Sequence, residues 1–119
     1  MKPKYSLYKN FFYAIDGAKE LVKEVSFKIE IACFFIAIIF LIFIKYPLWA
    51  KSFMFASLFF PLLAEAINTA IEKTIDLITT EYHTTAKHAK DIAAFGVLLS
   101  IFIPIFVWTG FIIYFWSQK

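Results

Sequence analysis

The stretch from Ile92 to Gln118 carries no charged side chain, and this feature limits most strongly what the chain can fold into. A helix needs roughly 20 apolar residues, at about 1.5 Å of rise each, to cross the hydrocarbon core of a bilayer. This stretch is longer than that. We therefore predict that it forms a transmembrane helix.

Two other apolar stretches, Ile31 to Ile44 and Ser52 to Ala64, are also free of charge but are each too short to span a bilayer. Both must extend into their charged flanks. The first can do so because Lys28 and Lys45 can reach the interface with their ammonium groups. The second must extend past Glu65, which brings carboxylates to the membrane boundary. The predicted spans are approximately residues 28–46, 48–78 and 91–116.

The composition agrees with a membrane protein. Hydrophobic residues make up 61% of the 119 residues, and the mean hydropathy is +0.73, well above that of ordinary soluble domains. The net charge is only +3 and the apolar runs leave no surface for a basic stripe, so we expect no nucleic-acid partner. The single Cys33 permits no internal disulfide. We predict one all-α membrane domain over residues 1–119.

The N-terminal segment is amphipathic. Leu7, Phe11, Ile15 and Val22 recur at helical spacing with charged residues between them, which predicts a surface helix over approximately residues 5–25. The segment contains acids and no small-residue cleavage site, so we do not expect it to be a signal peptide.

The distribution of lysines predicts the topology. Lysines are more frequent before Phe27 and between Lys73 and Lys90 than near Pro47 or at the C-terminus. By the positive-inside rule, the N-terminus and the second loop face the cytoplasm. We therefore expect three crossings of the bacterial cytoplasmic (inner) membrane, with the C-terminus outside.

Four polar residues should share one face of the second span. Glu65, Asn68, Glu72 and Asp76 are spaced by three, four and four residues, close to the helical repeat. Such a group of acids near the bilayer requires compensation, which a divalent metal could supply. Glu72 and Asp76 could instead be solvated residues paired with lysines such as Lys73. For Glu65 that alternative is weaker, because the preceding residues are apolar.

The loop after this span is polar, and Lys90 and Asp91 follow it where the third span begins. Lys90 could bind phosphate oxygens or could serve only as a topology anchor. His83 and His88 alone would make a poor zinc site. The chain contains no glycine-rich phosphate loop and no soluble-kinase motif, so any ATP must be held by carboxylates, metal and lysine.

The run EAINTAIEKTIDLITTEYHTTAKHAKDIAAFGVLL closely resembles the signature of the small prokaryotic diacylglycerol kinases, a family that includes undecaprenol kinases. The resemblance implies a homotrimer of three-span subunits with cytoplasmic active sites at subunit boundaries, and ATP and a magnesium ion (Mg2+) as co-substrate and cofactor. It implies that Glu65 is the catalytic base and that Glu24 and Glu72 bind metal. The residues expected at the ATP site are Tyr13, Glu24, Asn68, Glu72, Glu81, Tyr82, His83, Lys90 and Asp91.

The lipid substrate is expected to contact Glu30, Glu65 and Trp108. Glu24 and Glu30 are six residues apart, which would place them on different sides of a continuous helix. Either the helix therefore breaks near Ser26, or the two acids contact different neighbours. Glu30 favours diacylglycerol as the substrate, whereas the Asn-Thr-Ala-Ile-Glu form leans toward undecaprenol. From the residues alone, a small oligomeric proton-coupled transporter with Glu65 as its proton site is a more distant alternative.

Overall fold

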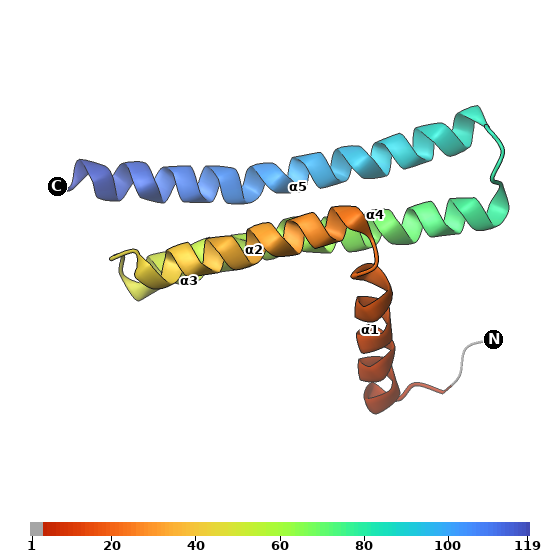
Figure 1. Cartoon of the computed structure of the whole chain (residues 1–119), viewed down its shortest axis with the longest axis horizontal. Helices are drawn as coiled ribbons and strands as arrows, with labels where there is room; N and C mark the ends of the chain where they lie inside the picture. Colours follow the sequence, from red (N-terminus) through yellow and green to blue (C-terminus); the bar gives the residue numbers. More distant parts are fainter. Residues whose placement is uncertain (1–3) are drawn as a thin grey trace.

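The computed structural model describes residues 4–119 as five α-helices and no strand within that range. The helices are α1 (Leu7–Leu21), α2 (Val25–Phe43), α3 (Leu48–Ser57), α4 (Phe59–Ile78) and α5 (Thr84–Ser117). Figure 1 shows α2, α3, α4 and α5 lying alongside one another, while α1 projects away at a steep angle. The all-α prediction is therefore confirmed.

Three helical segments are long and apolar enough to cross a membrane. They are α2, the combined α3–α4 unit from Leu48 to Ile78, and α5. Among the described residues only Phe27, Leu41, Ala50 and Met54 form a buried apolar core, and many large apolar side chains point outward. Such a surface requires lipid or further protein around it, as expected of a membrane protein whose helices satisfy their own backbone groups.

The helices differ in detail from the predicted spans. Helix α2 ends at Phe43, so the segment from Ile44 to Pro47 forms a connection rather than the end of the first helix. Helix α5 already begins at Thr84, where His83 caps it by accepting a hydrogen bond from the Thr85 amide at 3.2 Å. The polar segment before residue 91 is therefore helical too.

The N-terminal helix is separated from the first span by a short turn. Helix α1 begins after Ser6, whose side chain accepts a hydrogen bond from the Lys9 amide, and it ends at Leu21. Residues Val22 to Glu24 form the turn, and α2 starts at Val25. The break thus lies before Ser26, so Glu24 is in the turn and Glu30 lies within α2. No residue of α1 is buried, and its apolar side chains remain available to a membrane surface.

The second span is interrupted between α3 and α4. The amide of Leu58 donates to a carbonyl three residues back, so the carbonyl of Met54 lacks its usual helical partner. Two side chains replace it: the Ser57 hydroxyl donates at 2.6 Å and the Trp108 indole of α5 at 3.0 Å. Pro61 in the next turn has no amide hydrogen to donate, which accounts for a break at this point.

We predict that Trp108→Phe destabilises the protein by about 0.6 to 1 kcal/mol, because the ring is kept but the hydrogen bond to the Met54 carbonyl is lost. Unfolding of purified protein by titration with a denaturing detergent measures this difference. Trp116→Phe is the matched control, since Trp116 is 72% exposed. Equal stability of the two variants would contradict the structural role of the Trp108 bond.

Candidate active site

The polar face of α4 points into the protein. Glu65, Asn68 and Thr69 are all buried, with Glu65 only 5% exposed, whereas Leu63 and Ile67 on the same helix are exposed. A helix whose polar side faces inward and whose apolar side faces outward is typical of a membrane protein with an internal polar site. Of the four polar residues predicted to share one face, Glu65 and Asn68 are buried, Glu72 is half-buried and Asp76 is exposed.

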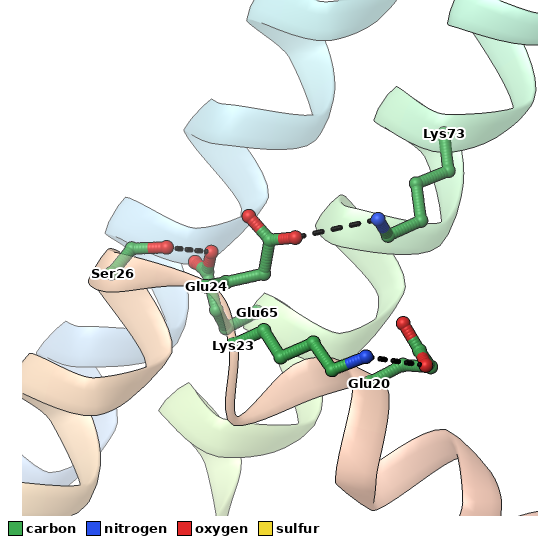
Figure 2. A network of polar contacts seen from close by, with 6 residues as sticks. All are labelled: Glu20, Lys23, Glu24, Ser26, Glu65 and Lys73. Atoms are coloured by element: carbon green, nitrogen blue, oxygen red, sulfur yellow. Dashed lines mark hydrogen bonds and ion pairs between the residues drawn. The ribbon is translucent and has the colours of Figure 1, made fainter.

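The Glu65 carboxylate is held from another helix. The hydroxyl of Ser26, in the first turn of α2, donates a hydrogen bond of 2.5 Å to Glu65 Oε1 (Figure 2). Within the described part of the chain, Ser26 is the only side chain that hydrogen-bonds to this carboxylate. The sequence did not identify Ser26 as a site residue, because the contact joins positions far apart in the chain.

One turn further along α4, an amide and a carboxylate form a second polar pair. Asn68 Nδ2 donates to Glu72 Oε1 at 3.1 Å, while Asn68 Oδ1 is buried and has no hydrogen-bond partner among residues 4–119. A buried carbonyl oxygen without a partner is unusual in proteins and is consistent with a place for a bound cation or donor.

Glu24 approaches α4 from the turn between α1 and α2. Its carboxylate lies 3.4 Å from the Lys73 ammonium, so this acid is paired with a cation rather than with Glu72 (Figure 2). The neighbouring Glu20 and Lys23 form a separate surface pair at 2.9 Å. The Lys23 ammonium, hydrogen-bonded to Glu20, lowers the pKa of that carboxyl below its usual value.

The donor set on this face fits a hard divalent cation chemically. Carboxylates and amide carbonyls are the ligand types that Mg2+ prefers, and it usually keeps several waters or substrate phosphate oxygens. Among residues 4–119, no three His, Cys, Asp or Glu side chains gather closely enough to hold an ion by themselves. Glu24, Glu72 and Asn68 could therefore hold a metal only together with oxygen atoms from a substrate or water.

A polar cleft lies at the turn between α4 and α5. Its volume is about 360 Å³, and five of the residues predicted to contact ATP line it. Lys90 pairs with Asp76 at 2.7 Å, so Asp76 makes a lysine contact, as expected if it is a solvated residue and not a metal ligand. Lys87 pairs with Asp91 at 2.5 Å. The predicted residues lining the cleft are Glu81, Tyr82, His83, Lys90 and Asp91.

An apolar groove of about 490 Å³ runs between α2, α4 and α5. It is lined by Glu30 and Trp108, the two residues predicted to contact lipid in addition to Glu65. Glu30 lies one turn after Ser26 on the same face of α2, and its Oε2 is buried without a hydrogen-bond partner in the part of the chain that the structure describes. An apolar groove that contains one unpaired carboxyl oxygen suits a lipid with a polar head.

Tyr13 lines neither the polar cleft nor the apolar groove. It lies on α1 and is 54% exposed. The groove between α1 and α4 is lined instead by Ala14, Gly17 and Ala18 of the same helix. Its predicted contact with ATP therefore has no geometric support within one chain.

Comparison with known proteins identifies relatives along most of the chain. Residues 12–113 match the family model described as prokaryotic diacylglycerol kinase. A diacylglycerol kinase of Sinorhizobium sp is 38% identical over 90 residues, which cover 75% of this chain and 65% of that protein. A diacylglycerol kinase of Helicobacter pylori (strain J99) is 28% identical over 108 residues, covering 90% and 84%. The undecaprenol kinase of Bacillus subtilis (strain 168) is 37% identical over 93 residues, covering 76% and 74%.

The match to the family model covers residues 12–113 of the 119 and includes the residues of the polar cleft and of the apolar groove described above. The signature on α4 and in the following loop lies within it. This chain belongs to the prokaryotic diacylglycerol kinase family.

Proposed function

We infer that this protein is an ATP-dependent lipid kinase that phosphorylates diacylglycerol to phosphatidic acid at the cytoplasmic face of the membrane. The observation that carries this proposal is the position of Glu65, a buried carboxylate on the same face of α4 as the Asn68–Glu72 pair. Family membership and the named activities of the relatives support the same reaction class.

In the proposed reaction the hydroxyl oxygen of the lipid attacks the γ-phosphorus of ATP. A bond forms between these atoms, the bond to the bridging oxygen breaks, and ADP leaves. Glu65 accepts the proton of the hydroxyl. It is seven residues, or about 10 Å along the helix, from Glu72, which separates the base from the proposed metal site. Phosphoryl transfer depends mainly on positioning and neutralisation of charge, so a dedicated nucleotide fold is not required.

The remaining polar residues hold the nucleotide in this proposal. Glu24, Glu72 and Asn68 would bind Mg2+, which neutralises phosphate charge when present. Lys90 would bind phosphate oxygens, with Asp76 at 2.7 Å fixing the position of its ammonium group. The cleft at the α4–α5 turn would take the more exposed part of ATP, through Glu81, Tyr82 and His83.

Diacylglycerol is the favoured substrate and undecaprenol the second candidate. Glu30 lines the apolar groove, and the family resemblance at this position supports diacylglycerol as the lipid. The undecaprenol kinase of Bacillus subtilis is about as similar in identity as the Sinorhizobium enzyme, which keeps undecaprenol as the alternative. A proton-coupled transporter has no comparable support, since the chain belongs to a kinase family.

The arrangement in the membrane is also proposed. The lysine distribution supports a cytoplasmic N-terminus and a cytoplasmic α4–α5 turn, which would put the polar cleft on the same side as cellular ATP. A homotrimer is what the family resemblance implies, and the exposed apolar side chains of a single chain leave surface for partner subunits as well as for lipid.

We predict that purified protein in lipid vesicles transfers phosphate from ATP to diacylglycerol when magnesium is added. The assay supplies diacylglycerol and undecaprenol separately and follows labelled phosphate into each lipid. Transfer to undecaprenol alone would establish the second candidate. Transfer to neither lipid would refute the proposed activity.

We predict that Glu65→Gln lowers turnover by about 10² to 10⁴, because the amide keeps the shape but cannot accept the proton. Turnover and ATP affinity are measured on the same preparation, and the affinity for ATP should be nearly unchanged. Glu20→Gln is the control, since Glu20 is an exposed acid whose pairing with Lys23 lies outside the site. Near-normal turnover of Glu65→Gln would exclude it as the base.

We predict that Glu72→Gln and Glu24→Gln each raise the magnesium concentration needed for half-maximal activity and reduce turnover by orders of magnitude. Each change removes one of the few hard oxygen ligands available on this face. Direct titration with Mn2+ detected by electron spin resonance measures metal binding independently of turnover. The assignment fails if both variants bind metal as the unchanged protein does.

A further inference from the structure

We propose that Ser26 is a positioning residue for the catalytic base: its hydroxyl holds Glu65 Oε1 so that Oε2 accepts the proton of the lipid hydroxyl. This inference rests on the proposed function of Glu65. It concerns a residue outside the signature on α4 and adds a role for the first turn of α2.

Ser26 makes the only side-chain hydrogen bond to the Glu65 carboxylate within the described chain. Its Oγ donates to Oε1 at 2.5 Å, and no other described side chain hydrogen-bonds to Glu65. Glu65 is 5% exposed, so water gives it little alternative support. A glutamate has three side-chain torsions, and one fixed donor restricts which oxygen faces the substrate.

The backbone around Ser26 is itself held in place. The turn at Val22 to Glu24 ends immediately before α2, and the adjacent Phe27 is one of the few buried apolar residues. Phe27 therefore anchors the first turn of α2, while the exposed Ser26 reaches Glu65 on α4 (Figure 2). The turn before α2 and the buried Phe27 side chain together set the position of the Ser26 hydroxyl.

Two roles for this hydrogen bond make different predictions. A bond that only ties α2 to α4 would change stability, and would leave kcat unchanged once both substrates are saturating. A bond that orients the base would change kcat while KM for ATP stays nearly constant, because the nucleotide residues are untouched. The position of Oε2 matters only in the second case.

The test compares Ser26→Ala, Ser26→Cys and Ser26→Thr in lipid vesicles, with kcat and KM measured for both ATP and lipid. We expect Ser26→Ala to lower kcat by about 10-fold to 100-fold, as for loss of a hydrogen bond to a charged group. Ser26→Cys has nearly the same shape but a weaker donor, so its kcat should also fall. Ser26→Thr keeps the hydroxyl at an exposed position and should recover most of the turnover.

Ser52→Ala is the matched control, because the Ser52 hydroxyl bonds only to a carbonyl of its own helix. Its kcat should equal that of the unchanged protein. Normal kcat in Ser26→Ala, or equal loss in Ser26→Thr and Ser26→Ala, would overturn the role of Ser26. Failure of the unchanged protein to phosphorylate either lipid would instead overturn the proposed function.

Discussion

The Glu65 carboxylate, which is buried in a membrane-spanning helix, imposes the first constraint on how the helices pack. Burying an ionisable group in a bilayer is costly unless it is paired or serves a function. Within the described chain, one hydroxyl donor compensates Glu65, the Ser26 side chain of α2, and this hydrogen bond links α2 to α4. The turn before α2 and the inward polar face of α4 therefore both help to accommodate the buried carboxylate.

The second constraint is the backbone itself, which has no water to bind within a bilayer. At the break between α3 and α4 the freed carbonyl of Met54 is satisfied by Ser57 and by Trp108 from α5. The same tryptophan lines the apolar groove, as do Pro61 of α4 and Pro104 of α5. The irregular part of the second span and the proposed lipid site are thus built from shared residues.

Much of the architecture could be predicted from the sequence, because hydropathy and helical spacing are local properties. The three apolar helical segments follow from the lengths of the charge-free stretches, and the N-terminal helix and the polar face of α4 follow from helical spacing. The pairing of side chains could not be predicted, since it depends on how helices pack. Ser26 contacts Glu65 across 39 positions, and Glu24 pairs with Lys73 rather than with Glu72. Tyr13 was assigned by resemblance, and within one chain it lies outside the clefts.

We propose that Glu65 lies where a lipid hydroxyl from the apolar groove meets the terminal phosphate of ATP. The most direct test is an experimental structure with Mg2+, a non-hydrolysable ATP analogue and a short-chain diacylglycerol. We expect the lipid hydroxyl to lie within about 2.6–3.2 Å of a Glu65 oxygen and in line with the γ-phosphorus. A lipid head bound away from Glu65, with the γ-phosphate elsewhere, would contradict it.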